Sequence, residues 1–135
     1  MDKLRLVNVA RQWLGTPFRH EGRSAAGVDC YGLLIVVATE TGLDIPIESG
    51  YGKRPSGSHM RKMLEQYATP VPISEMQLAD ILHVKFSDQP QHLAIVSSVA
   101  PLRIIHADAI AGRVVEHGLS DEWRSRVRGC YRVTQ

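Results

Sequence analysis

The chain has 135 residues, a net charge of +2 at pH 7, 44% hydrophobic and 22% charged residues, and two cysteines. These values are ordinary for one water-soluble globular domain, and the mild charge, without a basic stripe interleaved with aromatic residues, argues against nucleic-acid binding. Two cysteines are too few for a disulfide scaffold, and no run approaches the roughly 20 apolar residues that span a bilayer, so we expect no membrane partner.

The N-terminal segment predicts a helix over residues 3–14. Its side chains recur at helical spacing at Leu4, Val7, Arg11 and Leu14. Gly15-Thr16-Pro17 then ends the helix. Because charges occur throughout this segment, it lacks the apolar core of a signal peptide, and we expect a protein that is cytoplasmic as synthesised.

Three further segments complete the N-terminal half. A polar, glycine-bearing loop over residues 19–29 precedes the apolar run CYGLLIVVATET at 30–41, whose length favours a buried helix over a strand. Residues 44–57 are rich in Pro, Gly and Ser and predict a long loop. Residues 59–67 predict a short helix.

The C-terminal half changes to short strand-like runs separated by turn residues. The predicted strands are residues 81–86, 92–99, 102–107, 113–116 and 127–133. Ser120 is a candidate cap for a brief helix through residue 124. Helices followed by successive strands predict an α+β fold, with N-terminal helices packed on an antiparallel sheet of about five strands, in a single domain over residues 1–135.

Cys30 is a candidate nucleophile because it begins the predicted helix 30–41. The helix macrodipole and the nearby backbone N–H groups are expected to lower the pKa of a thiol at this position. Gly32 removes side-chain bulk near the thiol, which would let a substrate approach. The alternative is a small buried core residue, which is common for cysteine and is favoured when Cys30 is considered alone.

Two histidines are candidates to serve this thiol. His92 begins the strand 92–99 and is a candidate to take the thiol proton, with a solvated turn histidine as the alternative. A tight turn at Ala100-Pro101 would pair this strand with 102–107, so that His106 lies near His92 and orients its imidazole. The three residues together favour catalysis more than any one alone.

These residues lie in segments that resemble the NlpC family of papain-like cell-wall cysteine peptidases. GTPFRHEGRSAAGVDCYGLL is similar to the nucleophile motif, in which Asp-Cys-x-Gly begins a helix. QHLAIV is similar to the histidine strand of the family, and RIIHADAIAGRVVEHGL to the strand of its third residue and the strand after it. The tail VVEHGLSDEWRSRVRGCYRV and residues 19–22 most resemble the branch found in phage tails, prophages and gene-transfer agents.

The resemblance implies a papain-like fold with Cys30 as nucleophile, His92 as general base and His106 as the orienting residue. It implies that the Cys30 backbone N–H contributes to the oxyanion hole, and that the protein uses no metal and no organic cofactor. The implied substrate is the stem peptide of bacterial peptidoglycan, cut at an amide bond, and phage tail proteins are candidate partners. Incorporation into a phage or phage-like particle would carry such a protein to the wall of the next cell.

Residues around the nucleophile are candidates for substrate binding. Asp29 either caps the helix or anchors a substrate amine, and both roles remain open. Arg19 and Arg23 are candidates to bind a substrate carboxylate, with solvated loop residues as the alternative. Phe18 stands where the family commonly has a tyrosine whose hydroxyl helps the oxyanion site, and His20 is a candidate replacement donor.

The remaining candidates have structural interpretations. Ala79 stands where the family usually has a glycine before Asp80, which is expected to affect only the start of the strand. A zinc site is disfavoured because no close ligand pair such as C-x-x-C occurs. The other chemically capable side chains are expected to be surface or strand histidines (His59, His83, His117), core or rim aromatics (Trp13, Trp123) and buried filler (Cys130).

Two other functions remain open. A non-catalytic structural component of a phage tail tip would keep the fold and lose activity, and Phe18 favours this alternative. A thiol amidase or acyltransferase on the same fold would act on an amide outside peptidoglycan.

Overall fold

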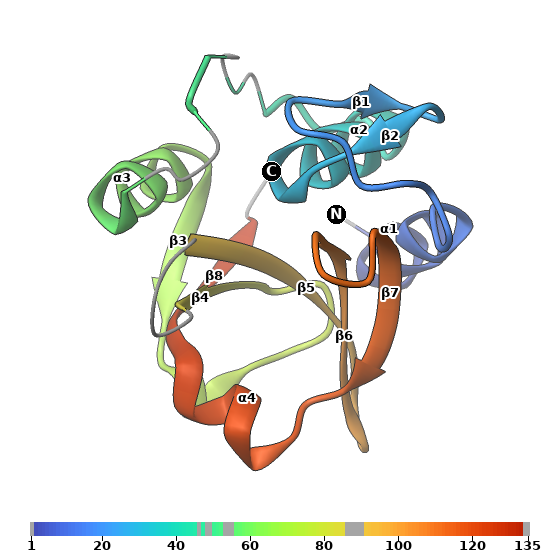
Figure 1. The fold of residues 1–135 in the computed structure, drawn as a ribbon. Coiled ribbons are helices and arrows are strands. Elements are labelled where there is room, and N and C mark those ends of the chain that lie inside the picture. The colour runs from blue at the N-terminus through green and yellow to red at the C-terminus, as the bar shows by residue number, and fades with distance from the viewer. Residues whose placement is uncertain (1, 46, 48–49, 53–55, 86–90, 134–135) are drawn as a thin grey trace.

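The computed structural model describes residues 2–45, 47, 50–52, 56–85 and 91–133 (Figure 1). In chain order its elements are α1 (Lys3–Gln12), β1 (Arg23–Ser24), β2 (Gly27–Val28), α2 (Cys30–Glu40), α3 (Gly57–Tyr67), β3 (Ala68–Val71), the 3-10 helix η1 (Ile73–Glu75), β4 (Ile81–Lys85), β5 (Gln91–Val99), β6 (Leu102–Asp108), β7 (Arg113–Gly118), α4 (Asp121–Arg126) and β8 (Val127–Val133).

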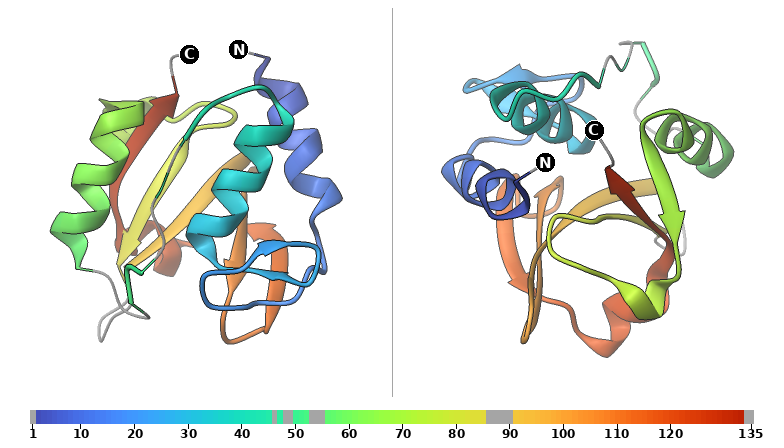
Figure 2. Two further views of the ribbon diagram at one scale, coloured as in Figure 1. Left: turned by 90° about the horizontal axis from the view of Figure 1, so that it is seen from above. Right: turned by 180° about the vertical axis from the view of Figure 1, so that it is seen from behind.

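The main sheet has six strands in the order β3-β8-β4-β5-β6-β7, and every neighbouring pair is antiparallel. The three N-terminal helices lie side by side over one face of this sheet (Figure 2), whereas α4 lies on its other side, beneath the curve of the strands (Figure 1). The predicted α+β class is therefore confirmed. The sheet has one strand more than expected because β3 pairs with β8 at the edge.

The boundaries of the predicted elements agree with the structure to within a few residues. The predicted strand 81–86 is observed as β4 up to Lys85, and residue 86 lies outside the described residues, as do parts of the predicted loop 44–57. The loop 19–29 contains a small hairpin, β1–β2, that was not predicted. Within the described residues, no helix is both long and apolar enough to cross a membrane.

The helix α1 buries only part of the stripe from which it was predicted. Leu4 is 58% exposed and Leu14 is 41% exposed, whereas the helix buries Leu6, Val7, Val9 and Ala10, of which Val7 alone belongs to the stripe. Arg11 lies at the surface and forms an ion pair with Glu116 of β7, with 3.1 Å between Nη2 and Oε2. The spacing identified the helix correctly, but most of the buried side chains lie outside the stripe.

Side chains of the sheet alternate between two apolar layers. On one face, Ile95 and Ile105 pack against α1 and α2. On the other face, Val96 and Ile104 pack in a cluster that also contacts Trp123 of α4. The central strands are therefore packed on both faces, and they carry His92 near the start of β5 and His106 near the end of β6.

Candidate active site

A pocket forms where the start of α2 meets the start of β5. Cys30 is the first residue of α2, and His92 is the second residue of β5. Its lining comes from the loop before α2, from α2, from the loop after it, from β5 and from the turn after β6: Phe18, His20, Asp29, Cys30, Tyr31, Tyr51, Gly52, Gln91, His92 and Ala109. The structure thus brings the predicted nucleophile and the predicted base to one cavity.

Asp29 organises the side of the pocket that carries the thiol. Its buried carboxylate accepts hydrogen bonds from the backbone N–H of Gly32 and of Glu21, each at 2.8 Å, and from the hydroxyl of Tyr51. The bond from Gly32 caps α2 and the bond from Glu21 ties down the preceding loop. The capping role of Asp29 is therefore observed, and the carboxylate also lies at the pocket wall.

Gly32 has a packing role that was not expected. A Cβ atom at Gly32 would lie 1.9 Å from the carbonyl oxygen of Gly22, which is far inside van der Waals contact. The missing side chain therefore lets the loop before α2 pack onto the helix. The expected access of a substrate to the thiol past Gly32 stays a prediction.

The histidine side of the pocket is a hairpin, as predicted. β5 and β6 are antiparallel, with Ile95 opposite Ile105. Nε2 of His92 lies 2.8 Å from Nδ1 of His106, and His106 is 1% exposed. This contact orients the imidazole of His92 and directs its second nitrogen, Nδ1, to other partners.

The ionisation of the thiol differs from the expectation. Burial, and then the carboxylate of Asp29, raise the pKa of Cys30 to about 12. Backbone hydrogen bonds at Leu93, Tyr31 and Cys30 favour the thiolate, as a helix start should, but their effect is smaller. Burial also lowers the pKa of His92 to about 4. The resting pair therefore consists of a neutral thiol and a neutral imidazole, and the predicted low thiol pKa is wrong.

The predicted substrate-binding residues divide into two groups. Phe18 and His20 line the pocket with Asp29, and Nδ1 of His20 lies 3.9 Å from the Asp29 carboxylate. Arg19 is exposed and Arg23 lies in β1, and neither lines the pocket. Nε and Nη2 of Arg23 are buried and have no hydrogen-bond partner within the described part of the chain.

Sequence reasoning missed two tyrosines that line the pocket. Tyr51 donates to Asp29 from the Gly-Tyr-Gly segment after α2, and its ring lies 4.5 Å from that of Tyr31. Tyr31 follows the nucleophile, and its buried hydroxyl has no hydrogen-bond partner among the described residues. An aromatic residue between two glycines was the only available signal for Tyr51.

The sequence did not predict that two further histidines contact residues of the site. His83 is buried in β4, not at the surface, and its Nε2 lies 2.6 Å from Oε1 of the pocket residue Gln91. His117 lies in β7 and its Nε2 is 2.7 Å from Nε2 of His106, so it extends the histidine pair to a chain of three. His59 is exposed, as predicted.

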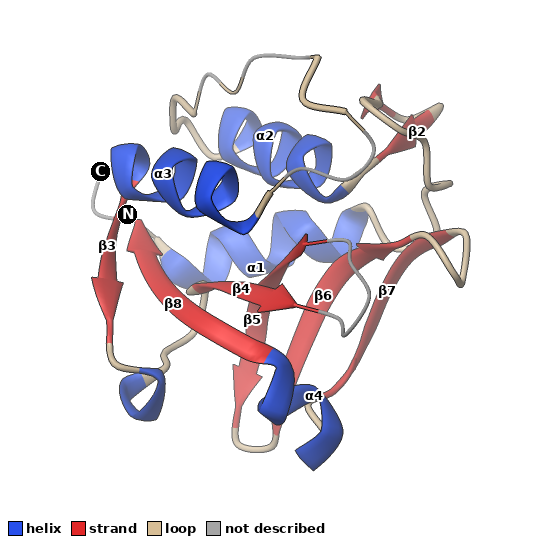
Figure 3. Cartoon of the chain, turned by 60° about the vertical axis from the view of Figure 1, so that its left-hand side comes forward, coloured by secondary structure: helices blue, strands red, loops and turns tan. Residues whose placement is uncertain are grey.

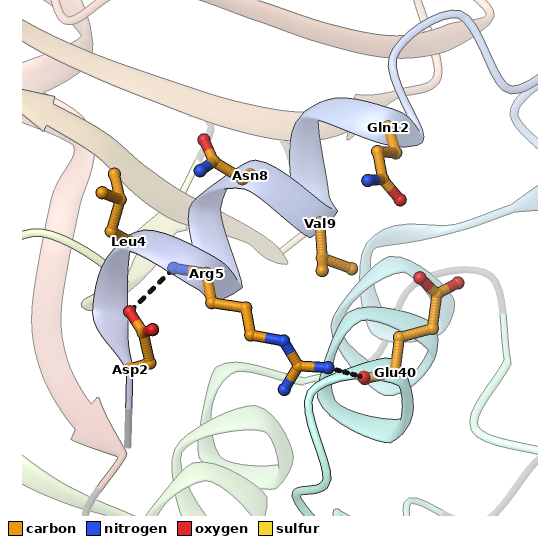
Figure 4. A pocket seen from close by; sticks show the side chains of 7 residues that line it. All are labelled: Asp2, Leu4, Arg5, Asn8, Val9, Gln12 and Glu40. Atoms are coloured by element: carbon orange, nitrogen blue, oxygen red, sulfur yellow. Dashed lines mark hydrogen bonds between the residues drawn. The ribbon is translucent and has the colours of Figure 1, made fainter.

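A second hollow, of about 570 Å³, lies at the opposite end of α2. It is formed by one face of α1 and by Glu40, whose carbonyl oxygen accepts a hydrogen bond from Arg5 at 3.1 Å (Figure 4). Its lining contains neither a cysteine nor a histidine. The larger hollow therefore offers no thiol and no imidazole, whereas the smaller pocket at Cys30 offers both.

Comparison with solved structures finds the same fold in several proteins, while a search of curated protein sequences finds no match. The chain is similar to the NlpC/p60 domain of peptidoglycan hydrolase SagA, with TM-score 0.72, 21% identity and full coverage of both chains. It is similar to the peptidoglycan hydrolase RipB of Mycobacterium tuberculosis, with TM-score 0.70 and 19% identity over 98% of this chain and 65% of that one.

A third relative keeps the fold without the activity. RipD of Mycobacterium tuberculosis is described as a non-catalytic NlpC/p60 domain protein adapted to peptidoglycan binding; it matches with TM-score 0.68 and 13% identity over 100% of this chain and 99% of that one. The sequence model of the NlpC/P60 family itself matches residues 15–132, which include Cys30, His92, His106 and His117. The chain therefore belongs to the NlpC/P60 family.

Proposed function

We propose that the protein is a cysteine hydrolase that cleaves amide bonds in the stem peptides of bacterial peptidoglycan. One observation carries the proposal: Cys30 and His92 line the same pocket, and His92 is oriented by a 2.8 Å contact with the buried His106. Family membership supports cell-wall peptidase activity for the fold. The peptidoglycan hydrolases SagA and RipB support this substrate.

The neutral resting pair favours a general-base mechanism. The sulfur of Cys30 attacks the amide carbon while the thiol proton passes to His92, because a preformed ion pair would place two charges in a buried site. The backbone N–H of Cys30, at the N-terminus of α2, is the proposed donor to the oxyanion. His92 then protonates the leaving amine, and water hydrolyses the thioester.

Asp29 is the proposed anchor for a substrate amine. Asp29 is 4% exposed, and its carboxylate accepts hydrogen bonds from two backbone N–H groups and from the Tyr51 hydroxyl, while Nδ1 of His20 lies 3.9 Å away, beyond hydrogen-bonding distance. Within the described residues no lysine or arginine pairs with it. A buried carboxylate at a pocket wall without such a partner favours binding of a cation.

The neighbouring residues are proposed to shape the rest of the substrate site. Phe18 supplies an apolar wall and His20 a hydrogen-bond donor. Arg23 carries two buried guanidinium nitrogens without partners among the described residues, which would suit a substrate carboxylate. Arg19 is exposed and would contribute only to a longer substrate that extends beyond the pocket.

The proposed setting is a phage or phage-like particle, with tail proteins as partners. The observation behind it is the resemblance of residues 19–22 and 114–133 to the phage-tail branch of the family. Mass spectrometry of particles purified from the source is expected to detect the protein. Particles that lack it would contradict this part of the proposal.

A non-catalytic role in peptidoglycan binding is the second candidate. Two observations favour it: Phe18 cannot donate a hydrogen bond to an oxyanion, and the non-catalytic RipD shares the fold. The two functions differ in what happens to the substrate after binding.

Product analysis separates the two candidates. Purified peptidoglycan fragments are incubated with the protein and with a Cys30→Ala variant, and the products are identified by liquid chromatography and mass spectrometry. New peptide termini with the original protein alone are expected. Full activity in Cys30→Ala would refute the mechanism, and binding without cleavage would favour the non-catalytic role.

A further inference from the structure

Three histidines on neighbouring strands form a hydrogen-bonded chain that begins at the pocket. His92 contacts His106 at 2.8 Å, and Nε2 of His106 lies 2.7 Å from Nε2 of His117. Nδ1 of His117 lies 2.9 Å from the carbonyl oxygen of Gly118. The chain crosses β5, β6 and β7, which lie side by side (Figure 3), and it ends at a half-buried position of β7.

The contact with Gly118 determines the direction of every other hydrogen bond in the chain. A carbonyl oxygen only accepts, so Nδ1 of His117 carries a proton, and in the tautomer with a single ring proton its Nε2 is an acceptor. Nε2–H of His106 therefore donates to His117, and Nδ1 of His106 accepts from Nε2–H of His92. A neutral imidazole holds one proton, so Nδ1 of His92 keeps its lone pair.

We propose that His117 is a positioning residue of the peptidase reaction: held by the Gly118 carbonyl, it sets the tautomers of His106 and His92 so that Nδ1 of His92 accepts the thiol proton. The inference rests on the proposed function. In that step, Sγ of Cys30 bonds to the amide carbon, the carbonyl electron pair moves to oxygen, and the thiol proton passes to Nδ1. With the chain reversed, Nδ1 would already carry a proton and could not accept another.

Burial keeps the two inner rings of the chain neutral. His92 is 7% exposed, and the ring of Trp123 packs 4.9 Å from that of His106 and 5.0 Å from that of His117. Burial lowers the pKa of His92 to about 4 and of His106 to about 3, so both rings are neutral at pH 7. The two short contacts between the rings are hydrogen bonds at 2.8 and 2.7 Å.

Two charged substitutions at His117 test the direction of the chain. In His117→Glu the side chain can only accept, so Nε2–H of His106 still donates and His92 keeps its proton on Nε2. In His117→Lys the side chain can only donate, which reverses the chain and moves the proton of His92 to Nδ1. We expect kcat on a peptidoglycan stem peptide to stay within about threefold in the first variant, and to fall on the order of 100-fold in the second, with little change in KM.

The tautomers are read directly by nitrogen NMR on the full-length protein with ¹⁵N-labelled histidine at pH 7. The expected result is a proton on Nε2 of His92 in the unmodified protein and in His117→Glu, and on Nδ1 in His117→Lys. A proton on Nδ1 of His92 in the unmodified protein would overturn the proposal, as would an unchanged proton position in His117→Lys. The spectrum needs no substrate, so it decides the role of His117 even when no peptide is cleaved.

Discussion

The molecule contains two aspartate–cysteine pairs, each with a buried aspartate, that differ in charge balance. Asp80, at the start of β4, receives a bidentate ion pair from Arg132 at 2.9 and 3.0 Å, and Sγ of Cys130 lies 3.4 Å from its carboxylate. Asp29 accepts bonds from backbone N–H groups and from Tyr51, with no arginine or lysine partner among the described residues.

This difference separates a structural pair from a functional one. Arg132 neutralises the carboxylate of Asp80. This ion pair joins β8 to the start of β4, and the carboxylate needs no cationic ligand. The carboxylate of Asp29 lines a pocket and, after burial, is the second cause that raises the pKa of the adjacent thiol. The thiol pKa alone does not distinguish the pairs, because burial raises the pKa of Cys130 to about 12 as well.

The largest expected effect separates the two cysteines. Cys30→Ala should lower kcat/KM for a stem peptide at least about 1,000-fold, because it removes the nucleophile. Cys130→Ala should leave kcat/KM within about twofold, since this buried residue lies outside the pocket. The measurement is steady-state hydrolysis, and equal losses in the two variants would erase the proposed distinction.

The next effect concerns Phe18, which lines the pocket beside Asp29 and Cys30. Phe18→Tyr restores a hydroxyl where the family commonly has one, and kcat should rise about 10- to 100-fold because one oxyanion donor is gained. Steady-state kinetics checks this on the substrate used for Cys30→Ala. An unchanged kcat would mean that another donor already serves the oxyanion or that residue 18 does not reach it.

Neutralising Asp29 should affect substrate binding, whereas neutralising Asp80 should affect stability. Asp29→Asn should raise KM for a stem peptide about 10-fold, since it removes the charge proposed to bind the substrate amine. Asp80→Asn should lower Tm by about 5 °C or more, because it breaks the ion pair with Arg132, while KM stays unchanged. Thermal unfolding and kinetics on both variants test the contrast, and a shared KM defect would contradict it.

The smallest effect lies beside the second pair. Ala79 has φ of 70°, a left-handed conformation that costs a residue with a side chain about 1 kcal/mol. Ala79→Gly should therefore raise the free energy of unfolding by several tenths to about 1 kcal/mol, without changing kcat. Urea denaturation measures this, and a loss of stability would show that the Ala79 methyl group packs usefully in the core.

The sequence predicts the elements that depend on local patterns. The helix at residues 30–41 and the strand at 127–133 follow from apolar runs and turn residues, and both occur nearly as expected. The strand β3 was not predicted, because this four-residue segment contains Pro70 and is a strand only through its pairing with β8. The small hairpin β1–β2 likewise depends on packing of the loop against α2.

The candidate site was predictable in part for the same reason. Cys30, His92 and His106 lie in recognisable sequence motifs, and one hairpin brings the two histidines together. Tyr51 and His117 reach the site only through loop packing and the pairing of β6 with β7, neither of which has a local signature. The low thiol pKa was wrong because a helix start is visible in the sequence, whereas burial is not.

The most direct test of the account is the rate of Cys30 alkylation by iodoacetamide as a function of pH, in a Cys130→Ser background with and without His92→Ala. Since the pKa of Cys30 is raised to about 12, the rate should climb with pH and show no plateau below pH 8. At pH 7 it should fall about 10-fold or more in His92→Ala, because the thiol loses its proton acceptor. Fast, pH-independent labelling between pH 5 and 7 would contradict the neutral pair, and equal rates with and without His92 would contradict the partnership of Cys30 and His92 itself.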